Sequence, residues 1–185
     1  MVFENVQATA AERAAARPGD ESVRPADVVM DRAFTVPGDS AQVWPWIAQL
    51  GKARAGWYLP RRVERALPRS RRTTWAVQPA WQHLDVGDII PDCGGRRETF
   101  EVAAIDPPHS IVYRSRRRQT EVTWSITIEP LPTGPGPARS RVFLRLRMAP
   151  IRHKRLAETV GDWFDLLTVA GMAAGLAQRL DQEQR

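Results

Sequence analysis

Apolar and polar residues follow two different spacings along this 185-residue chain, and the change between them predicts its organisation. Before about residue 73 the apolar positions fit one strand and two short helices, whereas from there to Met148 they fall on every second residue. After Pro150 the helical spacing returns, and no further proline interrupts it. The predicted elements are strands at Val28–Val36, Thr73–Val77, Asp88–Pro91, Thr99–Ile105, Ser110–Ser115, Glu121–Glu129 and Val142–Met148, and helices at 39–50, Pro60–Ala66 and Pro150–Gln184.

The predicted strands each have one apolar and one polar side. In the segment Glu121–Glu129 one side carries Val122, Trp124, Ile126 and Ile128. The segment Val142–Met148 repeats this alternation, and the proline- and glycine-rich stretch 130–137 joins the two as a hairpin. Such alternation is typical of an antiparallel sheet with one face in water.

The last segment, Pro150–Gln184, predicts one long helix with apolar residues around almost its whole circumference. Its middle consists of small residues, including Gly171 and Gly175, and each glycine costs about 1 kcal/mol relative to alanine in a helix. Either a sheet approaches the helix closely there, or the helix leaves space for a bound molecule. The outer side of the helix also needs a cover, and the N-terminal leader and a second copy of the chain, as in a homodimer, are the two candidates.

A transmembrane interpretation of this segment is not favoured. The apolar run is shorter than the roughly 20 residues that cross a bilayer, and Asp162, Asp165 and Arg179 bracket or interrupt it. We therefore expect no transmembrane segment.

The order of elements predicts an α+β helix-grip fold. In this fold a curved antiparallel β-sheet is wrapped around a long C-terminal α-helix, and two short helices follow the first strand. Residues 28–185 are expected to form this single domain. Residues 1–27 are rich in alanine and have few large apolar side chains, so they predict a flexible or loosely docked N-terminal leader.

Composition narrows the functional classes. The single cysteine, Cys93, excludes a disulfide framework and a thiolate metal cluster. No charged stretch followed by an apolar core occurs at the N-terminus, so the expected location is the cytoplasm.

The formal net charge is +6, and nearly all of the positive residues are arginine. Six of them are expected to project from the outer face of the sheet: Arg114, Arg116, Arg118, Arg141, Arg145 and Arg147. Such a face could attract an anionic partner. Because no aromatic side chains for base stacking lie among these arginines, a solvated face is favoured over one that binds nucleic acid.

The polar residues form no recognisable catalytic or metal-binding motif. His83, His109 and His153 lack the spacing of metal ligands, so we expect no metal. Cys93 has no partnered base, and the following glycines precede a strand and not a helix with a lysine. We therefore expect no cofactor and no fixed catalytic set.

Two motifs carry a family resemblance. The first is Trp44-Pro45-Trp46 followed by Gln49, Gly51, Arg54, Gly56, Trp57 and Tyr58. The second is Pro79, Trp81, Gln82, Leu84, Val86, Gly87 and Asp88. Over residues 28–181 the chain resembles a bacterial branch, of unassigned function, of the START-like or SRPBCC superfamily, which also contains birch-pollen-allergen-type carriers, lipid-transfer domains and polyketide cyclases. The resemblance implies a helix-grip fold with an internal cavity for a hydrophobic small molecule. The arginine-rich segment 61–72 and the small-residue section of the last helix depart from the family pattern.

Pattern and resemblance together place large side chains in the groove between sheet and helix. The expected ligand-binding residues are Arg54, Trp57, Tyr58, Phe100, Tyr113, Trp124, Trp163 and Leu167. Filling of the core is the competing interpretation of the aromatic residues. Gln49, Arg54 and Gln82 either pin the loop that carries Trp57 or bind the ligand.

Three functions remain open. The favoured one is a non-catalytic carrier or sensor of a hydrophobic small molecule such as a lipid, a quinone or a polyketide-like compound. The second is an enzyme of the polyketide cyclase or aromatase type, in which Arg54, Tyr58, Asp88 and Tyr113 would move protons. The third is an interaction module that uses the arginine face or the segment 61–72 to contact an anionic partner.

Overall fold

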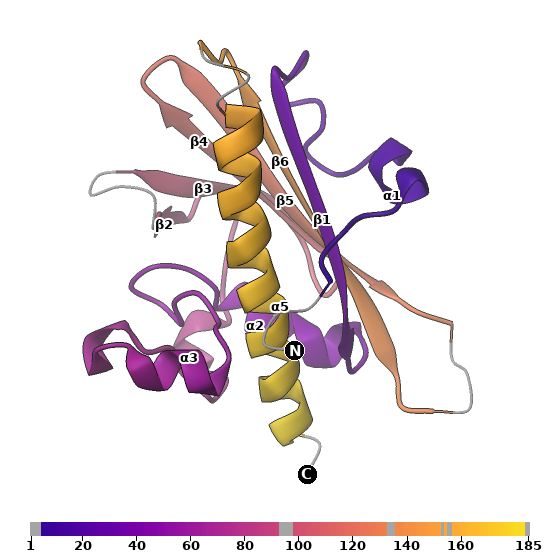
Figure 1. The fold of residues 1–185 in the computed structure, drawn as a ribbon, viewed down its shortest axis with the longest axis vertical. Helices are drawn as coiled ribbons and strands as arrows, with labels where there is room; N and C mark the ends of the chain where they lie inside the picture. The colour runs from indigo at the N-terminus through magenta and orange to yellow at the C-terminus, as the bar shows by residue number, and fades with distance from the viewer. Residues whose placement is uncertain (1–4, 93–97, 133–135, 153, 155–156, 184–185) are drawn as a thin grey trace.

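Six strands form one curved antiparallel sheet, and a long C-terminal helix lies across its inner face (Figure 1). The computed structural model describes residues 5–92, 98–132, 136–152, 154 and 157–183. The spatial order of the strands is β1-β6-β5-β4-β3-β2. Their bounds are β1 Val28–Pro37, β2 Ile89–Pro91, β3 Thr99–Asp106, β4 Ser110–Arg117, β5 Thr120–Pro130 and β6 Arg139–Ala149.

The helices occupy both ends of the chain and the connection after β1. They are α1 Ala10–Ala14, α2 Ser40–Ala48, α3 Arg61–Ala66 and α5 Asp162–Glu183, with short 3₁₀ turns at Arg69–Arg71 and Pro79–Trp81 and a π-helical turn at Ala157–Gly161. Asp39 and Gln42 form a capping box that fixes the start of α2. Gly51 has a φ of 133°, which lets the chain turn sharply after this helix.

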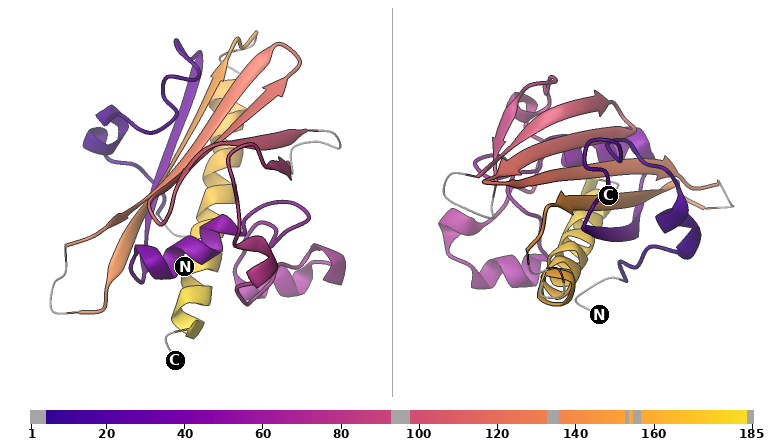
Figure 2. Two further views of the ribbon diagram at one scale, coloured as in Figure 1. Left: turned by 180° about the vertical axis from the view of Figure 1, so that it is seen from behind. Right: turned by 90° about the horizontal axis from the view of Figure 1, so that it is seen from above.

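The helix-grip arrangement is confirmed. Seen end on, the sheet curves over α5, while α2 and α3 lie at its lower end in the first view (Figures 1 and 2). The inner side of β5 faces α5 with the apolar residues that the alternation predicted, and Ile126 and Ile128 are almost completely buried. Gly175 explains the small-residue section, because a Cβ there would lie 2.6–2.8 Å from backbone atoms of Leu59. The close approach therefore comes from the loop before α3.

Two predicted elements differ in the structure. Residues 73–77 form no strand, because Thr73 and Thr74 bond instead to Glu64 and Arg179 on two helices. Continuous helical structure is described from Ala157, where the π-helical turn runs into α5, and not from Pro150. At Pro150 the chain stays tied to the strand ends, because the Ile151 amide donates to Asp27. Residues 153, 155–156 and 184 of the predicted helix lie outside the described residues.

The last helix is long and apolar enough to cross a membrane by length and composition alone. The segment Glu158–Glu183 has 26 residues, so the expectation that its apolar run is too short was wrong. In the structure 44% of its most apolar window is buried, and the helix packs on the sheet. Its packing is that of the core helix of a globular domain.

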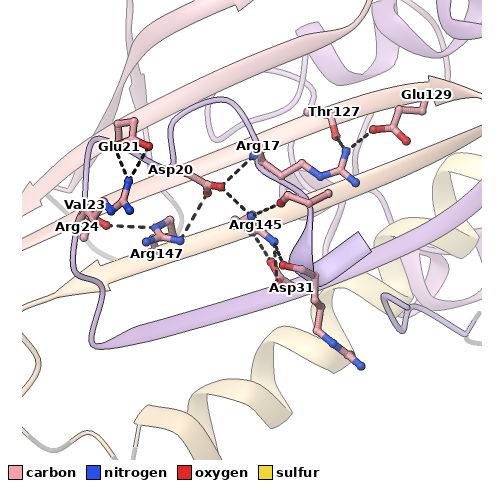
Figure 3. A network of polar contacts seen from close by, with 12 residues as sticks. Arg17, Asp20, Glu21, Val23, Arg24, Asp31, Thr127, Glu129, Arg145 and Arg147 are labelled. Carbon is pink, nitrogen blue, oxygen red and sulfur yellow. Dashed lines mark hydrogen bonds and ion pairs between the residues drawn. The ribbon is translucent and has the colours of Figure 1, made fainter. Parts of the chain in front are cut away.

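The leader, expected to be flexible or loosely docked, lies across the outer face of the sheet (Figure 3). Ala8 joins Ala33 and Phe143 in a small apolar cluster on that face. Thr123 and Ser125 are only 2% exposed, so the prediction of a wet outer face is wrong over the middle of the sheet. The polar outer side chains are buried because the leader covers them.

Charged side chains hold the leader in place. Arg145 donates to Asp20 of the leader at 2.9 Å and to Asp31 of β1 at 2.7 Å, and it is 4% exposed (Figure 3). Arg141 pairs with Glu12, and this pairing lowers the pKa of the Glu12 carboxyl to about 2. Three arginines of the predicted basic face, Arg141, Arg145 and Arg147, thus form ion pairs with the leader. Of the other three, Arg114 pairs with Glu101.

A buried ion pair joins the arginine-rich segment to the last helix. Arg179 of α5 donates to Glu64 of α3 at 2.8 Å, and both side chains are at most 4% exposed. Trp75 donates to the other Glu64 oxygen, so the carboxylate is satisfied on both sides. This contact places the loop before α3, and with it Trp57, against α5.

Candidate functional site

A cavity of about 520 Å³ lies between the first half of α5 and the inner face of the sheet. Five strands, α5 and the loop after α2 contribute to its wall, which is mostly apolar. The lining residues are Met30, Trp57, Asp92, Phe100, Arg117, Val122, Trp124, Leu146, Met148, Gly161, Phe164, Asp165, Thr168 and Val169. The last helical segment contributes Gly161, Phe164, Asp165, Thr168 and Val169 to this wall.

Three aromatic rings, those of Trp57, Phe100 and Trp124, line the cavity, and the ring of Tyr113 packs against two of them. Trp124 of β5 stacks on Trp57 at 5.9 Å between centroids and on Tyr113 of β4 at 5.5 Å. Phe100 of β3 contacts Trp124 at 5.8 Å. Because Phe100, Tyr113 and Trp124 face inward on neighbouring strands, the alternation of the sheet sets the geometry of this group.

Trp57 comes from a loop, and several polar groups fix that loop. Its indole nitrogen donates to the carbonyl of Thr168 on α5 at 2.9 Å. The Arg54 guanidinium donates to the Ala48 carbonyl at 3.0 Å and to that of Trp81. Gln49, which is fully buried, accepts from the Gln78 amide at 2.9 Å. These contacts agree with the interpretation in which Gln49 and Arg54 pin the loop that carries Trp57.

Three charged residues line the cavity: Asp92, Arg117 and Asp165. Arg117 pairs with Asp92, and its guanidinium lies 5.3 Å from the centroid of the Phe100 ring. Asp165 of α5 lies 2.9 Å from the Nε of Arg32. Burial raises the pKa of Asp165 to about 6, against the opposing effect of the Arg32 guanidinium. The wall thus offers a few polar groups to an otherwise apolar ligand.

The rim of the cavity carries exposed apolar residues on the first turns of the last helical segment. Phe164 lines the cavity yet is 70% exposed, and Val160, Trp163 and Leu167 are also largely exposed. These residues recur at positions i, i+3, i+4 and i+7, so they form one strip on the helix surface.

The structure brings together four of the eight predicted ligand-binding residues. Trp57, Phe100 and Trp124 line the main cavity, and Tyr113 lines a smaller one beside it. Arg54 and Tyr58 lie elsewhere, bonded to backbone carbonyls of the α2 region.

Trp163 and Leu167, the other two, are 62% and 46% exposed and line no described cavity. The reason is the rotation of the helix. Their neighbours Phe164, at the rim, and Thr168 line the cavity instead, and successive residues on a helix are about 100° apart. Because apolar residues surround this helix almost completely, periodicity does not identify the inward side.

Other lining residues were not predicted as ligand contacts. Val122, Leu146 and Met148 lie on the predicted inward faces of β5 and β6, so the alternation contained the signal for them. Asp92 and Arg117 carried no such signal, since their pairing joins positions 25 residues apart.

The described residues contain no group of three side chains that could hold a metal ion. Asp88 accepts a hydrogen bond from the Asp85 amide, as expected of a turn residue. Cys93 lies outside the described part of the chain.

Solved structures share this fold at low sequence identity. The protein jhp0584 from Helicobacter pylori is 15% identical with a TM-score of 0.58, over 89% of this chain and 95% of that one. XoxI from Bacillus cereus is 12% identical with a TM-score of 0.51, over 85% and 99%. MLL2253 from Mesorhizobium loti is 16% identical with a TM-score of 0.49, over 84% and 98%. No family model and no curated protein matches the sequence. At the level of the fold, the predicted helix-grip architecture is confirmed.

Proposed function

We propose that the protein binds a hydrophobic small molecule in the cavity between the sheet and α5, as a carrier or sensor. The observation that supports this most strongly is the cavity itself, because protein interiors are otherwise close-packed. Its volume of about 520 Å³ falls within the range of small-molecule sites, roughly 300–1,000 Å³. Lipids, quinones and polyketide-like ring compounds are the candidate ligand classes.

The lining argues for an apolar ligand with a ring system. Met30, Val122, Leu146 and Met148 provide an aliphatic part of the wall, which lies beside the aromatic residues on the same face of the sheet. Flat rings stack well on Trp and Tyr, and the flexible methionines can adapt to the edge of a guest. Leaving such a surface in water is unfavourable by about 25 cal/mol per Å² of apolar area, which a bound ligand would recover.

Native mass spectrometry of freshly purified protein, followed by thermal unfolding with these ligand classes, tests the proposal. A ligand present at 100 times its Kd stabilises the folded state by about 2.7 kcal/mol, which raises the Tm of a protein of this size by roughly 5–10 °C. We expect a stoichiometric adduct or such a shift with at least one class. If neither occurs with any of them, the proposal fails.

An enzyme that uses the same cavity is the second candidate, because Asp165 lies at the cavity wall with a pKa raised to about 6 by burial. A carboxyl group in this range can accept and return a proton near neutral pH. Among the four residues first expected to move protons, only Tyr113 adjoins a described cavity.

Deuterium exchange separates the two candidates. The enzyme interpretation predicts that the protein accelerates exchange of the α-protons of 2-tetralone in D₂O, followed by NMR, and that Asp165→Asn abolishes the acceleration. Binding of 2-tetralone with no acceleration would exclude this proton transfer and leave the carrier or sensor.

A further inference from the structure

A second, smaller cavity of about 70 Å³ adjoins the main one. The two cavities share the lining residues Trp57, Asp92, Phe100 and Trp124. Leu50, Ile90 and Tyr113 line only the smaller cavity. A ligand stacked on the shared aromatic residues therefore has a small chamber beside it, large enough for a group such as a carbonyl.

Tyr113 lines this chamber, and the hydrogen bonding of its hydroxyl is unusual. Tyr113 is 2% exposed, and its Oη has no hydrogen-bond partner among the described residues. The chain has one other tyrosine, Tyr58, whose hydroxyl donates to the Trp46 carbonyl at 2.8 Å and accepts from Gln49 at 3.0 Å. Buried polar atoms without a partner are rare in folded proteins, and each calls for an explanation.

The chemical state of Tyr113 makes it a donor. Burial raises the pKa of the phenol, so the hydroxyl keeps its proton at neutral pH. The Arg54 guanidinium acts on this pKa in the opposite direction, because its positive charge favours negative charge on a nearby oxygen. A neutral donor beside a positive charge suits an oxygen that carries partial negative charge.

We infer that the chamber receives an acceptor oxygen, such as a ring carbonyl, from a flat ligand stacked on Trp57 and Trp124, and that Tyr113 Oη donates to it. This inference rests on the proposed function, because it names a feature of the molecule that the main cavity would hold. Ring ketones and quinones fit this description, whereas pure hydrocarbons and simple alkyl chains do not.

The matched probes 9-fluorenone and fluorene test the inference, since they differ by one carbonyl oxygen. Both are titrated by displacement of N-phenyl-1-naphthylamine from wild type and from Tyr113→Phe. One hydrogen bond corresponds to a factor of roughly 3 to 10 in affinity. We expect Tyr113→Phe to weaken the binding of 9-fluorenone by this factor and to leave the affinity for fluorene unchanged within about twofold.

The control variant is Tyr58→Phe, which removes the hydroxyl of the tyrosine that lines neither cavity. It should leave the ratio of the two affinities unchanged. As a second measurement, the carbonyl stretching band of bound 9-fluorenone should lie lower in wild type than in Tyr113→Phe.

The outcomes separate the two proposals. If both probes bind wild type and Tyr113→Phe changes both equally or neither, this inference is overturned and the proposed function stands. If neither probe binds wild type, a flat ring ligand is excluded, and the inference falls with that part of the proposed function. A band position that is the same in wild type and variant also overturns the inference.

Discussion

At the scale of single residues, the two tyrosines show how the same side chain can serve the core or adjoin a cavity. Tyr58 is completely buried, its ring packs edge-on against Trp46 at 5.6 Å, and Arg179 lies over it. Its hydroxyl bonds join α2 to the following loop. The ring of Tyr113 packs against Trp124, while its hydroxyl has no described partner.

This contrast predicts opposite effects on stability. Tyr58→Phe removes the hydroxyl that donates to the buried Trp46 carbonyl and leaves the Gln49 amide with only the Ala76 carbonyl as acceptor, so it should lower the free energy of unfolding by about 1–3 kcal/mol. Tyr113→Phe removes an unpaired buried hydroxyl and should be neutral or slightly stabilising. Urea unfolding of both variants checks the pair. Equal losses in both would contradict the assignment of partners.

The raised pKa of Asp165 predicts that the stability of the folded protein depends on pH. Its pKa is about 6 in the folded protein against an ordinary value of 3.8, so the folded state retains a proton that the unfolded chain releases. The resulting stability is present below about pH 3.8 and is lost as the pH rises through about 6.

Asp165→Asn removes this titration. Its free energy of unfolding relative to wild type should therefore increase between pH 4 and pH 7, by about 2–3 kcal/mol. Denaturant unfolding at both pH values measures the change. A difference between variant and wild type that does not vary with pH would contradict the raised pKa.

At the scale of elements, α5 shows where local sequence is informative and where it is not. The alternation within β3, β4 and β5 indicates which side chains face inward, so Phe100, Tyr113 and Trp124 could be assigned to the groove from the sequence. The helix has apolar residues on nearly all sides, so its rotation depends on tertiary contacts such as Gly175 against Leu59. That is why Trp163 was expected inside and Phe164 was not.

The close approach at Gly175 predicts that Gly175→Ala is destabilising. The new methyl group would meet backbone atoms, which cannot move aside, so we expect a loss of about 2–3 kcal/mol despite the better helix propensity of alanine. Gly161→Ala is the matched control, because its methyl group would meet only the flexible end of Met30. Thermal unfolding should show a much larger loss for the first variant, and equal effects would contradict the close approach.

The leader was not placed from the sequence, since its ion-pair partners on β5 and β6 lie more than 100 residues away along the chain. Asp20 bonds to Arg145, and Arg17 donates to Thr127 and Glu129 on β5. Its few apolar residues suggested loose attachment, but paired charges on a covered sheet face dock it. Ion pairs between residues that are far apart in the sequence leave no short-range pattern.

Removing one of these pairs should loosen the leader. Asp20→Asn leaves the buried Arg145 with less compensation, so we expect a loss of about 1–2 kcal/mol in unfolding free energy and faster proteolysis within residues 5–27. Glu21→Gln is the control, because the Glu21–Arg24 pair is highly exposed and should contribute less than about 1 kcal/mol. Equal effects of the two substitutions would contradict the docking described above.

At the scale of the whole molecule, the leader, the sheet and α5 form three layers. The leader covers the outer face of the sheet, and α5 covers the inner face (Figures 1 and 2). Arg32 joins sheet to helix through Asp162 and Asp165. At the other end of α5, the Arg179–Glu64 pair and the contact at Gly175 hold the helix. The cavity lies along the first half of α5, beside the contact of Arg32 with Asp165.

Titration with N-phenyl-1-naphthylamine, whose fluorescence rises in apolar surroundings, tests the central claim most directly. Wild type should bind it saturably with one site per chain. Leu146→Trp, which fills the cavity from β6, should lose at least tenfold in affinity while keeping its fold. Leu131→Trp, outside the described cavities, should bind like wild type. The absence of saturable binding by wild type, or undiminished binding by Leu146→Trp, would contradict the account.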